Sequence, residues 1–276
     1  MLAFIPMLCD QRDLLAIPRG RARFDRYLRL MGGPDFEVIR PLHEFNPMAG
    51  PVLADRIDAL LDHAAEAADE AVRRLGEKGP DMRAALVVLD DLAGSWTARE
   101  RIELDRIRRP ARSKSMRDWL VVPWWASEAA TADAIRAAVL ASAYRAIIGA
   151  RSGPRRTLGG AMELEGRALG FAGAIRLALD PDDLQYSKAV LEPLRESDDL
   201  PVILAAMYGD GPARRLGHPP LGLSARAGCA VALAETQAAW RRWSRTGQRP
   251  RLSLQTHRRA AQALPETAFR SARRSS

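Results

Sequence analysis

The chain has 276 residues, 47% of them hydrophobic and 28% charged, and this composition excludes an intrinsically disordered protein. Its two cysteines, Cys9 and Cys229, lie far apart without a CxxC or Cys/His pattern, which argues against both a disulfide scaffold and a structural zinc site. No run of 18 apolar residues occurs, and Asp10 interrupts the apolar N-terminal stretch, so we predict neither a membrane span nor a signal peptide. A soluble protein of the cytoplasm is therefore expected.

The formal net charge of +8 is concentrated near the C-terminus. Residues 241–276 contain ten arginines and one acid, Glu266, and this balance of +9 leaves the rest of the chain near neutral. The overall excess of 39 Arg over 3 Lys also has a simpler explanation, because a GC-rich genome favours arginine. We predict one globular domain over 1–246, followed by a basic, disordered tail over 247–276.

The first half of the chain shows two amphipathic helices and one buried strand. Helical spacing predicts helices over 23–31 and over 51–75, the second ended by Gly76. Residues 84–89 are six consecutive apolar residues, which indicates a strand that is buried on both faces. A capping-box pattern over 97–100 then predicts a helix that must end before Pro110.

The second half is mainly helical after one more strand. Residues 119–125 form the second predicted strand, and Pro123 favours an edge position or a bulge because it cannot donate to a ladder. Helices are predicted over 127–150, 158–179, 182–194 and 225–243, whereas 202–208 fits either a strand or a helix. Gly166, Gly170 and Gly173 are spaced so that another helix could approach closely. The fold class is thus mainly α (α+β), a helical domain with a small embedded β-sheet whose strands lie near 84–90 and 119–125.

Acidic residues follow both predicted strands. Asp90 and Asp91 end the first, and Glu128 occupies the equivalent place after the second. If the strands are parallel neighbours, Asp90 and Glu128 converge at the edge of the sheet where ligands usually bind, and could act in acid/base chemistry or ligate Mg²⁺. Because side chains alternate along a strand, at most one of the two aspartates faces a given cleft. In the simpler interpretation, Asp91 accepts local backbone hydrogen bonds, and Glu128 is a first-turn acid of a helix capped by Ser127.

A histidine in a restricted loop is the third candidate for catalysis. His43 lies between Pro41 and Pro47, and a rigid loop can hold a side chain that titrates near neutral pH. We therefore take Asp90, Glu128 and His43 as candidate catalytic residues. The four histidines show neither HxH nor HExxH spacing, so we assign no metal ligand, and no cofactor is indicated.

A basic turn precedes the predicted helix that begins at Leu158. Free N–H groups at a helix start, two glycines and nearby guanidinium groups together can bind phosphate or carboxylate. The candidate anion-binding residues are Arg151, Arg155, Arg156 and Thr157. Their spacing fits neither GxxxxGK[ST] nor GxGxxG, so a nucleotide site is not predicted, and a solvated basic turn is the commoner outcome for such a pattern.

These patterns leave three functional hypotheses open. The first is a small polar or anionic ligand bound at the carboxyl end of the small sheet, with acid/base or divalent-metal-assisted enzyme chemistry as an extension. The second is binding of nucleic acid or another polyanion through the Arg-rich C-terminal segment. The third is a structural or interaction protein that associates through its glycine-bearing helix.

Overall fold

The computed structural model describes most of the chain. The described residues are 2–32, 42, 44–75, 82–92, 98–108, 119–174, 177 and 179–246. The chain divides into two compact units: unit 1 comprises Met1–Ile102 with Ala111–Ile147, and unit 2 comprises Glu103–Pro110 with Ile148–Ser276. The single domain over 1–246 stays a prediction, and the tail over 247–276 lies outside the described residues.

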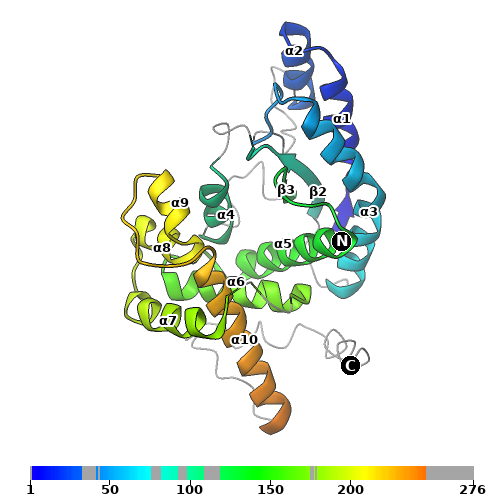
Figure 1. Ribbon diagram of the computed structural model, residues 1–276. Coiled ribbons are helices and arrows are strands. Elements are labelled where there is room, and N and C mark those ends of the chain that lie inside the picture. The colour runs from blue at the N-terminus through cyan, green and yellow to red at the C-terminus, as the bar shows by residue number, and fades with distance from the viewer. Residues whose placement is uncertain are drawn as a thin grey trace. The chain divides into compact units, whose positions relative to one another are not determined.

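Unit 1 contains a parallel sheet in the order β1–β2–β3 (Figure 1). The strands are β1 (Leu2–Phe4), β2 (Met82–Leu89) and β3 (Trp119–Trp125). The prediction of a doubly buried strand is confirmed, because each residue from Ala84 to Leu89 is at most 2% exposed. Of the edge position and the bulge that Pro123 allowed, the structure shows the edge position, since β3 comes last in the strand order of the described residues. β1 was not predicted, because three residues are too few to show a periodicity.

Helices α1 and α3 pack against the strands of unit 1. The helices that lie wholly or partly in unit 1 are α1 (Met7–Ala16), α2 (Arg21–Leu30), α3 (Pro51–Leu75), α4 (Arg99–Arg108) and α5 (Ala132–Ser152), of which α4 and α5 continue into unit 2. α2, α3 and α4 match the predicted helices closely. α5 begins later than expected, and Thr131 is its capping residue, since its Oγ1 accepts a hydrogen bond from Ala134 N at 3.2 Å.

A glutamine from α1 extends the sheet where β1 ends. β1 pairs with β2 only as far as Ala84, and farther along β2 the fully buried side chain of Gln11 takes the place of a strand. Its Oε1 accepts from Val88 N at 2.9 Å, and its Nε2 donates to Val88 O at 3.0 Å. The amide thus satisfies both backbone groups of a buried residue two positions before Asp90.

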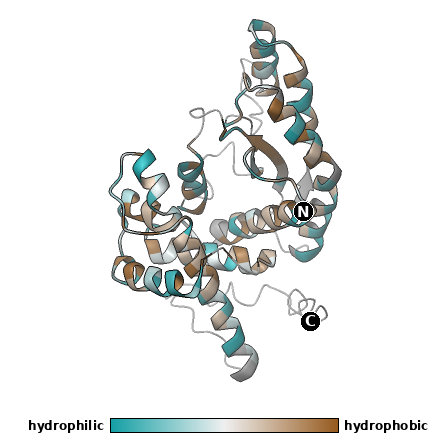
Figure 2. Ribbon diagram, in the orientation of Figure 1, coloured by the Kyte–Doolittle hydropathy of each residue, from teal (hydrophilic) through white to brown (hydrophobic). Residues whose placement is uncertain are grey.

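Unit 2 is helical and is organised around α10. Its elements are α6 (Leu158–Ala172), α7 (Pro181–Leu191), the 3₁₀ turn η3 (Glu192–Leu194), α8 (Leu200–Tyr208), α9 (Asp210–Arg215) and α10 (Ala227–Thr246). α10 packs on α6, α7 and α8 (Figure 1). Its hydrophilic residues gather toward its C-terminal end (Figure 2). The ambiguous segment 202–208 is helical, and α9 lies between two predicted elements, in a stretch for which no helix was predicted.

The close approach predicted for the glycines is made by α10 of the same chain at Gly166 and Gly170, whereas a Cβ on Gly173, which lies just after α6, would meet nothing within 4 Å. A Cβ on Gly166 would lie 2.3 Å from Ala232 O, so only a residue without a side chain fits there. α6 ends earlier than predicted, because Gly173 adopts the left-handed conformation (φ 82°) that terminates helices. The mainly α fold with a small embedded sheet is confirmed. Within the described part of the chain, no helix is both long and apolar enough to cross a membrane.

Candidate functional site

The candidate site lies where β2 and β3 end side by side. Leu89 is opposite Trp125 in the parallel register, and Ala126 N donates to Leu89 O at 2.9 Å. The residues that follow the two strands therefore leave the sheet at the same level. Asp91 comes from β2, whereas Ser127 and Glu128 come from β3, so residues far apart in sequence meet at the carboxyl edge of the sheet.

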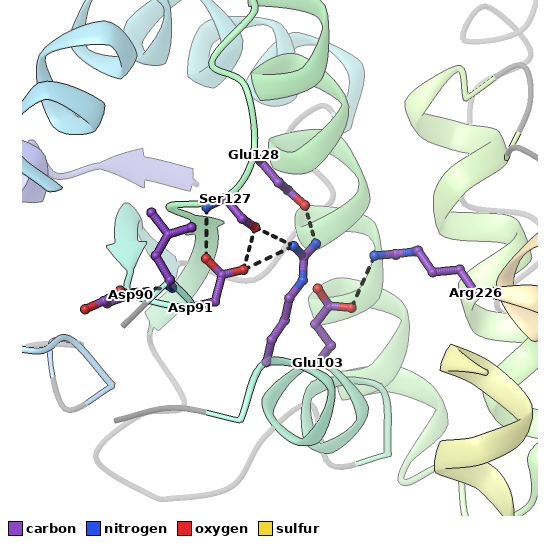
Figure 3. A network of polar contacts seen from close by, with 8 residues as sticks. Asp90, Asp91, Glu103, Ser127, Glu128 and Arg226 are labelled. Carbon is purple, nitrogen blue, oxygen red and sulfur yellow. Dashed lines mark hydrogen bonds and ion pairs between the residues drawn. The ribbon is translucent and has the colours of Figure 1, made fainter. Parts of the chain in front are cut away.

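Asp91 and Ser127 form a double hydrogen bond across this edge (Figure 3). Ser127 N donates to Asp91 Oδ1 at 2.9 Å, and Ser127 Oγ donates to Asp91 Oδ2 at 2.6 Å. The second distance is typical of a hydroxyl that donates to an ionised carboxylate. This pairing fixes the loop after β3 against the loop after β2.

Arg99, from the first turn of α4, joins the carboxylates of both strands. Its Nη1 lies 3.4 Å from Asp91 Oδ2, and its Nη2 donates to Glu128 Oε1. The guanidinium also lies over the ring of Trp125, with 5.3 Å between its Cζ and the ring centroid. A cation over an aromatic face is attracted to it, so β3 also helps to hold Arg99 in place.

The burial of these side chains makes the cluster more than a surface ion pair. The exposed fraction is 11% for the Asp91 side chain and 19% for Arg99, against 37% for Glu128. Charges that are partly removed from water interact more strongly than solvated ones, because the local dielectric constant is lower. Glu128 is the most open of the three charged side chains, and Ser127 beside it is exposed.

Asp90 points away from this cluster (Figure 3). Its Oδ1 accepts from Leu92 N at 3.1 Å, and its Oδ2 lies 3.5 Å from Asn46 Nδ2, with the residue only 7% exposed. We expected Asp90 to lie close to Glu128, but in the structure it is Asp91 that does so. The local backbone bond expected of Asp91 is made by Asp90 instead. Both differences have one cause, because successive side chains leave a strand on opposite faces.

A buried arginine positions the loop that carries Asn46. Arg23 of α2 is 6% exposed, and its Nη1 donates to Ala49 O at 3.1 Å while its Nη2 donates to Leu15 O at 2.9 Å. Burial lowers the pKa of Arg23. The guanidinium thus connects the end of α1 to the loop before α3. His43, the third candidate catalytic residue, belongs to the same stretch of chain but lies outside the described residues.

The candidate anion-binding residues lie in unit 2, around the start of α6. Thr157 is its N-cap, since Thr157 Oγ1 accepts from Gly160 N at 3.3 Å. Leu158 N donates to Ser197 O at 2.9 Å, and Gly159 N donates to Arg195 O at 2.8 Å. The N–H groups on which the anion-binding hypothesis depended therefore already have acceptors within the chain.

The three arginines of that hypothesis differ in their surroundings. Arg155 is 7% exposed, its stem lies near Gly160, and its buried Nε has no hydrogen-bond partner among the described residues. Arg156 is exposed, and its backbone oxygen accepts from Arg108 Nη2 at 3.2 Å. Arg151 lies in the last turn of α5, and its side chain is outside the description. Of the three, Arg156 offers an exposed guanidinium.

Sequence reasoning missed two members of the sheet-edge cluster. Arg99 was read as part of a helix start and Ser127 as a helix cap, although each is defined by partners distant in sequence. The only local signal for Arg99 is a basic residue in the first turn of a helix, where the macrodipole favours acids. Such a cation indicates a partner elsewhere, which the structure identifies as Asp91 and Glu128.

The described residues hold no group of three or more His, Cys, Asp or Glu side chains arranged for a metal ion. Comparison with known proteins adds no further constraint on the site. No protein-family model, no curated protein and no solved structure matches this chain.

Proposed function

We propose that this chain binds a small polar ligand at the carboxyl end of β2 and β3, against Ser127 and Glu128. The observation that carries the proposal is the meeting of Asp91, from β2, with Ser127 and Glu128, from β3, around the Arg99 guanidinium. The exposed Ser127 and the 37% exposed Glu128 side chain are the groups that a ligand can reach. The site belongs to the strand edge at which parallel sheets usually bind ligands.

The charge of the cluster favours a ligand that donates hydrogen bonds over an anion. Asp91 and Glu128 carry two negative charges, and Arg99 supplies one positive charge that both already share. An anion would have to displace a carboxylate from the guanidinium, whereas a hydroxyl or ammonium group can donate to a remaining lone pair of Glu128. If the site is catalytic, Glu128 is the group placed to exchange a proton with the ligand.

The test is a titration of the protein labelled with ¹⁵N-tryptophan, followed through the indole resonance of Trp125. Ethanolamine, which carries a hydroxyl and an ammonium group, serves as the probe, and inorganic phosphate is the anionic comparison. We expect a saturable shift with ethanolamine that weakens at least about tenfold in Glu128→Gln, as loss of a charge-assisted hydrogen bond implies. The matched control is Glu66→Gln, an exposed residue of α3. A missing or non-saturable shift, or an equal response to phosphate, contradicts the proposal.

A second candidate function rests on the basic C-terminal segment. α10 ends at Thr246 with exposed Arg241 and Arg242, and the sequence beyond it keeps the same excess of arginine. We propose that this segment binds a polyanion such as duplex DNA. Affinity for a duplex should fall steeply between 50 mM and 200 mM salt for the full chain and be lost when the chain ends at Thr246. Salt-independent or absent binding contradicts this second proposal.

We also propose a cytoplasmic location for the protein. Among the described residues neither cysteine forms a disulfide: Cys9 is exposed and Cys229 is buried. An exposed thiol is typical of a reducing compartment. Fractionation of the source cells, with an antibody against the chain, tests this location directly.

A further inference from the structure

The turn before α6 contains a buried arginine with an unused hydrogen-bond donor. Arg155 is 7% exposed, and its Nε is buried without a hydrogen-bond partner among the described residues. A buried donor without an acceptor is unfavourable, and native proteins rarely keep one without a reason. The groups beside this donor indicate which kind of acceptor it can meet.

The Arg155 side chain lies along the first turn of α6. A Cβ added to Gly160 would lie 3.6 Å from Arg155 Cδ and 3.5 Å from Thr157 Oγ1. Since Nε is bonded to Cδ, the unused donor and the Thr157 hydroxyl lie beside the same point. Both distances are ordinary van der Waals contacts, so the missing side chain of Gly160 leaves room there for one atom of a ligand. We call this place, formed by Arg155, Thr157 and Gly160, the Gly160 cradle.

Backbone hydrogen bonds hold the cradle in place. Arg155 N donates to Arg108 O at 3.2 Å, and Arg108 Nη2 donates to Arg156 O at 3.2 Å, so the end of α4 fixes two successive residues of the turn. Gly159 N donates to Arg195 O at 2.8 Å, which anchors the first turn of α6 as well. A preformed site binds a small ligand at a lower entropic cost than a flexible loop does.

The cradle favours a ligand that accepts hydrogen bonds. Thr157 Oγ1 accepts from Gly160 N at 3.3 Å, and its hydroxyl can donate its own proton to a ligand, as Arg155 Nε can. α6 has 15 residues, and the positive end of its macrodipole lies at this turn. A helix start with a nearby guanidinium group is a favourable place for an anion. The exposed Asp198, whose backbone oxygen accepts from Arg108 Nη2 at 3.2 Å, opposes an anion, but water and salt screen its carboxylate.

We propose that the Gly160 cradle binds the phosphate group of a small molecule, with Arg155 Nε and the Thr157 hydroxyl as its donors. The oxygens of a phosphate have a tetrahedral arrangement, so two of them can accept from these donors while a third lies over Gly160 at the start of α6. A carboxylate has two oxygens in one plane and cannot occupy all three places. Where a Cβ would stand at Gly160, a phosphate oxygen can approach the helix start. The cradle lies within unit 2 and does not depend on the ligand proposed at the sheet edge.

The protein has 20 glycines, and NMR of the chain labelled with ¹⁵N-glycine follows binding, with the Gly160 resonance assigned by its loss in Gly160→Ala. The probes are inorganic phosphate, methyl phosphate and acetate at one ionic strength. We expect the two phosphates to shift the Gly160 resonance saturably, with a dissociation constant on the order of 1 mM for so small a ligand. Tighter binding of methyl phosphate indicates a phosphate monoester as the ligand, and tighter binding of inorganic phosphate indicates the free ion. An equal response to acetate, or a shift without saturation, overturns the proposal.

Gly160→Ala supplies the second measurement. Its Cβ would meet Arg155 and Thr157 at van der Waals distance and alanine favours a helix, so the midpoint of thermal unfolding should stay equal or rise. Phosphate raises this midpoint by binding, and also through its exclusion from the protein surface. The matched control is Gly170→Ala in the same helix, which should keep the full rise with phosphate, whereas Gly160→Ala should keep only the part due to exclusion. An equal rise in the two variants contradicts the proposal.

Arg155→Met removes the unused donor and keeps a stem of similar length. Because Nε has no partner within the described part of the chain, the midpoint without phosphate should be unchanged or higher. The rise caused by phosphate binding should be lost, and the dissociation constant from the Gly160 resonance should increase at least about tenfold. A lower midpoint without phosphate would show that the guanidinium supports the fold itself, and the proposal would then be wrong.

Discussion

Replacement of Gln11 by methionine should destabilise unit 1 through the backbone of β2. Methionine has a similar length and no hydrogen-bonding amide, so the substitution leaves Val88 N and Val88 O buried without their present partners. Each buried backbone group that loses its partner lowers the free energy of unfolding by about 1–3 kcal/mol. Methionine also avoids the cost of burying a polar amide, and this offsets part of the loss. The expected loss is about 3 kcal/mol, or roughly 6–12 °C in the midpoint of thermal unfolding for a chain of this size.

Urea denaturation followed by circular dichroism measures this loss. The matched control is Gln237→Met, where a half-buried amide donates to Ala174 O at 3.2 Å, and there we expect a loss of about 1 kcal/mol. Gln11→Glu adds a pH test. A carboxyl buried at position 11 has a raised pKa, so its charged form destabilises the protein at neutral pH, and stability should return as the pH falls through that raised pKa. An equal loss in Gln11→Met and Gln237→Met would show that the amide does not support β2.

Three further substitutions test separate features. Arg99→Met should lower the free energy of unfolding in urea by about 1–3 kcal/mol, because it leaves partly buried carboxylates without their cation. The control is Arg12→Met, which breaks an ion pair whose two side chains are each about half exposed, and the loss there should be less than about 0.5 kcal/mol. Asp210 accepts three backbone hydrogen bonds, which outweigh burial and lower its pKa. The ionised Asp210 therefore stabilises the protein at any pH above the pKa of the unfolded carboxyl. At neutral pH the free energy of unfolding should be about 1–3 kcal/mol higher than in Asp210→Asn. This difference should disappear as the pH falls through the lowered pKa of Asp210 in the folded protein. Gly166→Ala should lower the free energy of unfolding by about 3 kcal/mol or more in calorimetry. In Gly170→Ala the Cβ would meet only the Thr236 methyl group at 3.3 Å, and the higher helix propensity of alanine offsets this tight contact, so the change should be near neutral. Equal effects would contradict the close helix contact.

The parts of the fold that the sequence predicted are those with a strong local pattern. Residues 84–89 are apolar without alternation, which only a strand covered on both faces explains at that length. The heptad-like spacing over 51–75 and the glycines of α6 are equally local. α1 was missed because Gln11 and its charged neighbours interrupt the apolar run. The polarity of Gln11 has its reason in β2, 77 residues away.

The sequence pointed to the carboxyl edge of the sheet and to Glu128, but not to Arg99 as a neighbour of Glu128. The acids after both strands drew attention to the carboxyl edge of the sheet, yet the sequence could not choose between Asp90 and Asp91 as the neighbour of Glu128. That choice depends on the direction in which each side chain leaves β2. Arg99 is 8 residues from Asp91 and 29 from Glu128, so no periodicity connects them. Arg155 illustrates the opposite error, because a basic residue in a turn was expected to be solvated and is buried.

The contact between Gly166 and the backbone of Ala232 constrains how unit 2 can change over evolutionary time. Most neighbouring helices are separated by side chains, so they can drift apart or slide as those side chains are exchanged. Here main chain touches main chain, and no exchange of side chains elsewhere can make room for a Cβ. Divergent homologues should therefore conserve a glycine at position 166 even where the sequences of α6 and α10 have otherwise diverged.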